Sequence, residues 1–229
     1  MDLHESWVKR VVAVCGEDMA GFDPGSQSVM RFHPEPWRRW NMADPDLSQL
    51  LDTFKDGIHR RDLRNLARDL GTARARRVAF IATLLWGAGE TNRYYGRHAE
   101  ALKSADLERI LDVSVKQVHG DDLEGAWSTA AAIPGLDFRF FTKWLWLAGV
   151  SADLPAPPLV YDRLVRNALE RAHWPFDRRR INERRRWVNY CRDAAAVART
   201  LVAQPGAPKV TGEWVEYWLF SGAPGAERL

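Results

Sequence analysis

The spacing of apolar residues is the feature that most constrains the fold of this chain. From Asp46 onward they recur at intervals of three and four, at Leu47, Leu50, Leu51, Phe54 and Ile58, then at Leu63, Leu66 and Leu70. This repeat is typical of amphipathic helices, because it gathers the apolar side chains on one helical face. No segment alternates apolar and polar residues as a strand does, and no strand–helix–strand rhythm occurs. The sequence therefore predicts an all-α protein.

Further helices are predicted from the same periodicity. They cover Leu3–Val14, Val78–Trp86, Ala99–Leu111, Leu123–Ala132, Phe138–Gly149, Val160–His173, Arg179–Ala203 and Trp214–Phe220. Residues 21–45 are rich in proline, glycine and aromatic residues, so they are predicted to form an irregular connector that packs against the body. Gly71 is the predicted end of the helical stretch that starts at Asp46.

The basic residues are concentrated rather than evenly spread. The net charge is only +3, but arginines cluster at positions 74, 76 and 77 and at positions 178, 179, 180, 184, 185 and 186. Arginine pairs bidentately with phosphate, so these clusters favour a nucleic-acid partner. The 11 Trp, 9 Phe and 5 Tyr residues could stack on bases as well as fill a core. A solvated helix surface would have the same arginine pattern, and both interpretations remain open.

Cysteine and histidine usage indicates neither a metal site nor a cofactor. Cys15 and Cys191 are far apart and match no zinc or iron–sulfur spacing. The six histidines provide no helical pair suited to a metal. The N-terminus lacks a secretory signal, and the apolar run Val78–Trp86 is too short to cross a bilayer. We expect a monomeric cytoplasmic protein without a membrane partner.

The most informative stretch begins with a tight turn between two predicted helices. In Ile133–Asp137 the turn is made by Pro134, Gly135 and Leu136. Backbone N–H groups at the start of the second helix can hold a DNA phosphate without reading the base sequence. An ordinary helical hairpin that only stabilises the core would look the same.

An acidic residue follows 27 positions after Gly135. Asp162 lies in the segment PPLVYDRLVRNAL, where two prolines and an apolar pair precede a predicted amphipathic helix. An aspartate at this place is commonly an N-cap. Capping does not exclude catalysis, because a helix N-terminus stabilises the ionised carboxylate.

Together these two segments resemble the hairpin and catalytic-aspartate region of the helix-hairpin-helix DNA glycosylase superfamily, in its bacterial 8-oxoguanine glycosylase-like branch. Pro134, Gly135 and Leu136 match the turn, while Val160, Asp162 and Val165 match the later motif. The resemblance implies two helical lobes around a central cleft. It places the functional centre in 131–170, within one compact unit over 1–229 that is completed by 1–72 and 178–220. The resemblance also implies double-stranded DNA as the partner and Asp162 as a catalytic residue.

Bifunctional members of that superfamily carry a lysine at the start of the second hairpin helix. Counting from the turn places Arg139 there, whereas the distance to Asp162 favours Lys143. Lys143 lies among apolar and aromatic residues, so it either snorkels from an apolar helix or lines a pocket. In a pocket, desolvation would make the neutral amine a usable nucleophile. The resemblance therefore implies Lys143 as a second catalytic residue, with strand cleavage if it attacks the sugar. Arg139 is then expected to contact DNA.

Aromatic and polar residues nearby complete the expected site. Phe138, Phe141, Trp144 and Trp86 are predicted to line a base pocket. The loop after Val78–Trp86 is expected to fill the gap left by an extruded base, with Asn92 and Arg93 touching DNA. The alternative is a broken helix end whose aromatic residues complete the core.

The Arg-rich helix is the last predicted DNA contact. Arginines at intervals of three and four share one face of this helix, and Arg184 and Arg185 are predicted to contact DNA, although a solvated face is an equally plausible interpretation. The predicted function is a DNA glycosylase that excises oxidised guanine, or a hypermodified base of phage DNA in antiviral defence. Two alternatives remain: a non-catalytic DNA-binding adaptor that keeps the hairpin, and a helical protein–protein module.

Overall fold

A computed structural model of the chain describes residues 3–18, 27–41, 44–90, 94–175, 182–203 and 210–221. In these ranges every extended regular element is a helix, and the one β-type pairing is an antiparallel bridge between Met30 and Ile58. The prediction of an all-α protein is confirmed. None of the helices in the described ranges is long and apolar enough to cross a membrane.

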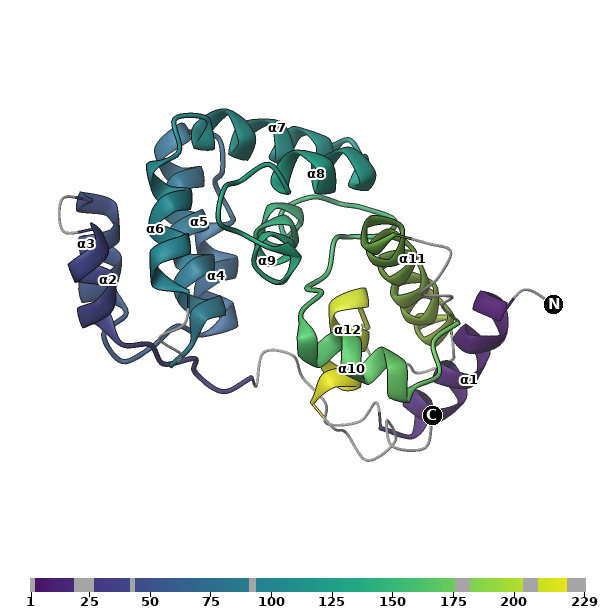
Figure 1. The fold of residues 1–229 in the computed structure, drawn as a ribbon. Helices are drawn as coiled ribbons and strands as arrows, with labels where there is room; N and C mark the ends of the chain where they lie inside the picture. Colours follow the sequence, from purple (N-terminus) through teal and green to yellow (C-terminus); the bar gives the residue numbers. More distant parts are fainter. Residues whose placement is uncertain are drawn as a thin grey trace. The chain divides into compact units, whose positions relative to one another are not determined.

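The helices belong to two compact units (Figure 1). The central unit, Gln27–Ala152, contains α2 (Pro34–Asn41), α3 (Pro45–Thr53), α4 (Arg60–Leu66), α5 (Ala73–Ala88), α6 (Tyr95–Lys103), α7 (Leu107–His119), α8 (Leu123–Ala130) and α9 (Phe138–Gly149). The terminal unit, Met1–Ser26 with Asp153–Leu229, contains α1 (Leu3–Asp18), α10 (Arg163–Arg171), α11 (Glu183–Val202) and α12 (Gly212–Phe220). The expected single functional body and its cleft stay predictions.

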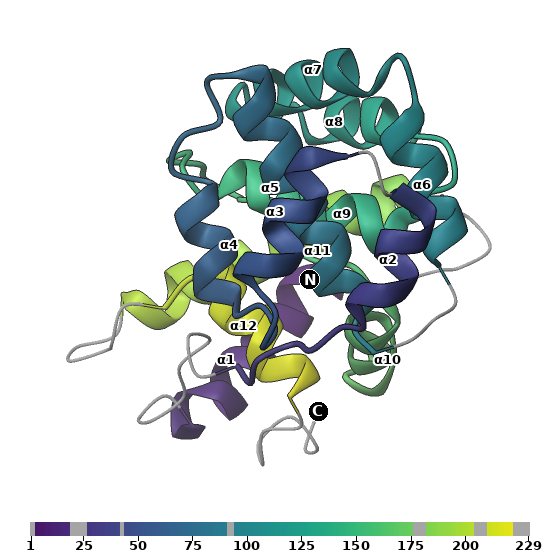
Figure 2. The same cartoon turned by 90° about the vertical axis from the view of Figure 1, so that its left-hand side faces the viewer.

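Helix α9 is the core helix of the central unit. It packs against α5, α7 and α8, and α7 lies beside α8 (Figure 1). Every residue from Phe140 to Gly149 is buried. Trp144 is fully buried, and its indole Nε1 donates to Ser114 Oγ at 2.9 Å. On another side of this unit, α2 packs on α6, while α3 and α4 pack on α5 (Figure 2).

The terminal unit is built around α11. Helices α1 and α12 both pack on α11, and α10 packs on α12. Trp187 of α11 and Trp218 of α12 are fully buried. Trp7 of α1 is also fully buried, and its indole Nε1 donates to Ala172 O at 3.1 Å. This bond ties the first helix to the end of α10.

Two predictions for the first third of the chain are wrong. The connector predicted over 21–45 packs against the body as expected, but it is not irregular throughout: it contains α2, whose Trp37 is fully buried against Tyr95 of α6. Burial of this large ring stabilises a short helix that local sequence does not favour. The helix predicted from Asp46 to Leu70 is interrupted after α3. There Gly57 takes a φ of +111° and Ile58 bridges to Met30, so the backbone leaves the helical conformation.

Two further boundaries differ from the prediction because of capping residues. The predicted helix Ala99–Leu111 is divided into α6 and α7, since Ser104 is extended at the end of α6. Helix α5 begins at Ala73 rather than Val78, because the Thr72 hydroxyl accepts from the Ala75 N–H at 3.1 Å. Apolar periodicity marks where a helix becomes buried, which is often later than where it begins.

Candidate functional site

Asp162 is the N-cap of α10 and is partly exposed. Its Oδ1 accepts from the backbone N–H groups of Leu164 at 2.9 Å and Val165 at 3.2 Å. These bonds fix the carboxylate at the positive end of the helix, where the ionised form is stabilised. The predicted capping role is confirmed. Asp162 is therefore not sealed inside the terminal unit.

The segment before Asp162 is held by side chains of two other helices. The Val160 N–H donates to Glu216 Oε2 of α12 at 2.8 Å, and Trp187 Nε1 of α11 donates to Leu159 O at 2.8 Å. Glu216 is 1% exposed and Trp187 is fully buried. Neither anchoring role could be predicted from the sequence, because each residue lies far along the chain from the segment it holds.

Arg166 of α10 and Arg186 of α11 both lie close to the Glu183 carboxylate. Arg186 Nη1 lies 2.9 Å from Glu183 Oε1, and Arg166 Nη2 lies 3.5 Å from the same oxygen. They line a cavity of about 400 Å³, together with Tyr161 and Trp174. Burial raises the pKa of Tyr161 well above its ordinary value. Neither Arg166 nor Tyr161 was predicted from the sequence to belong to the site.

The predicted hairpin between α8 and α9 is present in the central unit. Gly135 has a φ of +74°, and a Cβ atom there would lie 2.5 Å from Arg97 O of α6. Only glycine fits both the backbone conformation and this close approach. Ile133 is buried under the turn, while Pro134 and Leu136 are partly exposed.

The start of α9 carries its own carboxylate. Asp137 is the N-cap, and it accepts from the Arg139 N–H at 2.9 Å. Arg139 Nε also lies 2.9 Å from Asp137 Oδ2, and its guanidinium lies over the Tyr94 ring at 5.7 Å. Burial raises the pKa of Asp137, but the hydrogen bonds and charge of Arg139 outweigh that effect and hold it below its usual range. Arg139 is therefore engaged within the hairpin while its side chain stays partly exposed.

Lys143 lies one turn further along α9, and it is 6% exposed. Its Nζ donates to Arg139 O at 3.0 Å and lies 5.8 Å from the centre of the Trp86 ring. The side chain also packs against Gly87, where a Cβ atom would lie 2.9 Å from Lys143 Cδ. The ammonium group thus points back toward the hairpin end of its own helix.

The predicted base-pocket residues differ in burial. Trp86 is 5% exposed and stacks on Trp146 at 5.7 Å, with the Arg60 guanidinium 4.6 Å from the Trp146 ring centre. Phe138 is partly exposed and lies parallel to Trp127. Phe141 and Trp144, in contrast, are buried in the helical core at 3% and 0% exposure, which favours a packing role for both.

His98 of α6 is a buried residue that the sequence analysis did not single out. It is 1% exposed, and its ring lies 4.4 Å from Phe140 and 5.3 Å from Trp37. In the described part of the chain neither ring nitrogen has a hydrogen-bond partner. Burial lowers the pKa of His98 to about 4, against a smaller opposing effect of Asp137. The sequence offers one indication that His98 is buried, namely the aromatic residues Tyr94 and Tyr95 that precede it.

The remaining predicted DNA contacts lie at the edges of the described ranges. Arg185 is exposed and Arg184 is partly exposed in the first turn of α11. Asn182 caps that turn by accepting from the Arg185 N–H at 3.0 Å. Asn92, Arg93 and the arginines at positions 178, 179 and 180 lie outside the described residues.

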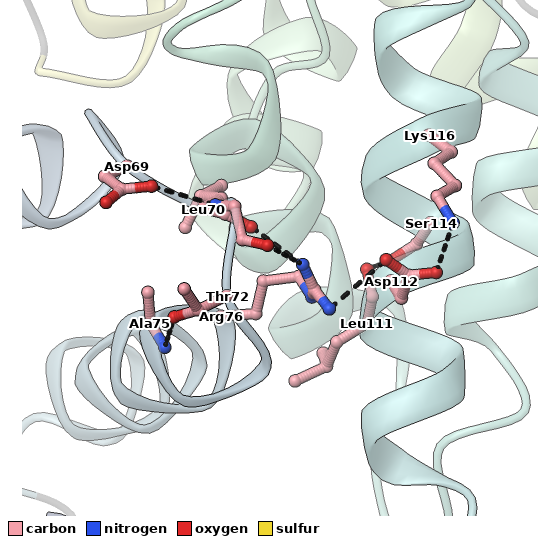
Figure 3. A network of polar contacts seen from close by, with 10 residues as sticks. Asp69, Leu70, Thr72, Ala75, Arg76, Leu111, Asp112, Ser114 and Lys116 are labelled. Carbon is pink, nitrogen blue, oxygen red and sulfur yellow. Dashed lines mark hydrogen bonds and ion pairs between the residues drawn. The ribbon is translucent and has the colours of Figure 1, made fainter.

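The arginines of α5 are paired with carboxylates. Arg74 pairs with Asp46 at 3.0 Å, Arg77 with Asp44 at 2.5 Å, and Arg76 with Asp112 at 3.2 Å. Figure 3 shows the third pair, in which Arg76 also donates to Leu70 O at 2.9 Å while Lys116 contacts the same Asp112. The hydrogen bond from Lys116 holds the pKa of Asp112 below its ordinary value. These arginines connect α5 to α3 and α7 rather than forming an unopposed positive face.

Comparison with known proteins gives one family match. The model of the family described as "Putative 8-oxoguanine DNA glycosylase OGG-like protein" matches residues 23–220. No curated protein matches the chain, and neither does any solved structure. The matched range contains the α8–α9 hairpin, Lys143 and Asp162.

Proposed function

Since the chain belongs to the OGG-like family of 8-oxoguanine DNA glycosylases, we propose that it extrudes a damaged or modified base from double-stranded DNA and hydrolyses the bond between base and sugar. Family membership supports DNA binding and N-glycosylase chemistry in general. The extrusion step, the substrate and the residue roles are the proposal. The reaction ends at an abasic site, and strand cleavage is not part of it.

Asp162 carries the proposal. As the base leaves, positive charge develops on the sugar, and a fixed carboxylate stabilises that charge or orients the attacking water. Asp162 suits this role because it is partly exposed and is held at the start of α10 by two backbone N–H groups. A carboxylate fixed in this way needs little reorganisation when the charge appears.

The hairpin and the start of α11 are proposed to hold the DNA backbone. Pro134, Gly135 and Leu136 form a turn whose surface is accessible, and Arg139 is partly exposed beside it. Arg184 and Arg185 supply further positive charge, and Asn92 and Arg93 are proposed to touch the strand near the extruded base. Such contacts position the duplex without selecting a sequence.

Oxidised guanine is the proposed substrate, because the family description names 8-oxoguanine. Trp86 and Phe138 are the proposed stacking surfaces for the base, with Phe141 and Trp144 supporting them from the core. A hypermodified base of phage DNA, with a role in antiviral defence, is the second substrate class. Measuring which base is released from a defined duplex distinguishes the two substrate classes.

The test is release of free base from duplexes that contain single oxidised, alkylated or phage-type modified bases. Asp162→Asn is the informative variant, because asparagine caps a helix as well as aspartate does but carries no charge. Asp122→Asn is the matched control, since Asp122 caps α8 through an equivalent bond to the Gly125 N–H at 2.9 Å. We expect Asp162→Asn to slow base release roughly a hundredfold or more while duplex affinity is retained.

Two results would contradict the proposal. Equal base release by Asp162→Asn and the wild type would remove Asp162 from the chemistry. Salt-dependent duplex binding without release of any base in the panel would instead favour the non-catalytic adaptor.

A further inference from the structure

The segment that leads into Asp162 lacks the regular backbone hydrogen bonds that would fix its conformation. Residues 153–161 are non-helical, and Pro155, Pro157 and Pro158 have no N–H group to donate. A segment of this kind depends on side chains from elsewhere to fix its backbone. Its position therefore decides where Asp162 and the start of α10 lie.

Two buried side chains provide that anchorage at adjacent residues. Glu216 Oε2 accepts from the Val160 N–H, and Trp187 Nε1 donates to Leu159 O, both at 2.8 Å. One bond comes from α12 and the other from α11, so the backbone is held through both its donor and its acceptor groups. Arg199 of α11 adds a third bond further upstream, to Pro155 O at 2.7 Å.

Burial makes the Glu216 bond costly to replace. Glu216 is 1% exposed, and a carboxylate at such a position loses most of its hydration. Removing this acceptor would leave the Val160 N–H buried without its partner, and the segment would then have to move to find another. Asp162 is two residues away, so any such movement reaches it directly.

We propose that Glu216 and Trp187 are positioning residues for the Asp162 carboxylate, holding it at the place where it meets the sugar of the extruded nucleotide. The inference rests on the proposed function of Asp162. Neither residue touches DNA in this mechanism. Both act through the backbone of Leu159 and Val160, so their loss should slow the reacting step and leave duplex binding intact.

The variants separate positioning from general stability. Glu216→Ala removes the acceptor, Glu216→Gln keeps an oxygen that can accept, and Trp187→Phe keeps the ring but removes the donor. Glu213→Ala is the matched control, because it removes a second buried acid, 7% exposed, one turn earlier on the same helix. Unfolding midpoints of all four variants are measured with their kinetics.

We expect Glu216→Ala and Trp187→Phe to lower kcat for base release about 10–100-fold, with little change in KM or duplex affinity. Glu216→Gln should recover most of the lost rate. If both damaging variants lose no more activity than Glu213→Ala at comparable stability, the positioning role is wrong.

Amide hydrogen exchange gives a readout that needs no activity. The Leu164 and Val165 amides donate to Asp162, so we expect them to exchange faster in Glu216→Ala and Trp187→Phe than in Glu213→Ala. Unchanged exchange at these two amides would overturn the inference even if the wild type released base. Absence of base release by the wild type, with faster exchange in the variants, would refute the proposed function instead.

Discussion

Gly135 lies directly against the backbone carbonyl of Arg97, so the tip of the α8–α9 hairpin is pinned to α6. A Cβ atom on Gly135 would lie 2.5 Å from Arg97 O, and the residue has a φ of +74°. We expect Gly135→Ala to lower the free energy of unfolding by about 2 kcal/mol or more, because left-handed strain and a backbone clash add. Urea denaturation measures this.

Gly71→Ala is the control for that variant. Gly71 is exposed, and its nearest obstacle is the Asp69 side chain at 3.2 Å rather than backbone. If Gly135→Ala lowered the free energy of unfolding by no more than Gly71→Ala does, the hairpin tip would be able to shift away from α6.

Because His98 is buried, we expect the free energy of unfolding to fall in mild acid. Its pKa is lowered from 6.5 to about 4 in the folded chain, mainly by burial, so the folded state disfavours protonation. The stabilisation from the neutral ring is complete above pH 6.5 and is lost as the pH falls toward 4, by up to about 3 kcal/mol. We expect His98→Phe to flatten the stability profile between these pH values, measured by chemical unfolding.

The exposed His33 provides the comparison, because His33→Gln removes a histidine without removing a buried one. If His33→Gln and His98→Phe changed the slope equally, the acid sensitivity would not originate at His98.

Lys143 is expected to form no covalent bond with DNA. Its Nζ is bonded to Arg139 O, and the side chain is 6% exposed. Sodium borohydride added during base release should therefore trap no protein–DNA adduct. A trapped adduct that disappears in Lys143→Gln would reveal an attacking amine and an associated lyase step.

The two cysteines should be unreactive in the native protein. Cys15 and Cys191 form no disulfide and are fully buried, and burial raises the pKa of the Cys191 thiol well above its ordinary value. We expect iodoacetamide to label neither residue until the protein is unfolded, as counted by mass spectrometry. Labelling of Cys191 in native buffer would indicate local opening between α11 and the Leu159 segment.

Much of the fold could be predicted because its signals are local. The hairpin helices, the Asp162 cap and the all-α class follow from apolar spacing and from capping or turn residues that lie within a few positions of one another. Helix α2 could not be predicted in this way, since it depends on the burial of Trp37 against a helix some sixty residues later.

The candidate site was predictable only in its local parts. Asp162 stands out because prolines, an apolar pair and a helix surround it in sequence. Glu216 and Trp187 do not, because a buried acid and a core tryptophan acquire their role only when the chain brings them to Leu159 and Val160. The arginine cluster at positions 74, 76 and 77 favoured a nucleic-acid contact. In the structure these arginines of α5 pair instead with Asp44, Asp46 and Asp112.

The double use of Asp162, as a helix cap and as the proposed reactive group, has a consequence for reading other members of the family. A chain that has abandoned the chemistry can keep α10 intact with asparagine, serine or threonine at this position, because each of these still caps a helix. An intact helix at this place is therefore no sign of an enzyme. The identity of the N-cap residue, aspartate or a neutral side chain, is what distinguishes active members of the family from inactive ones.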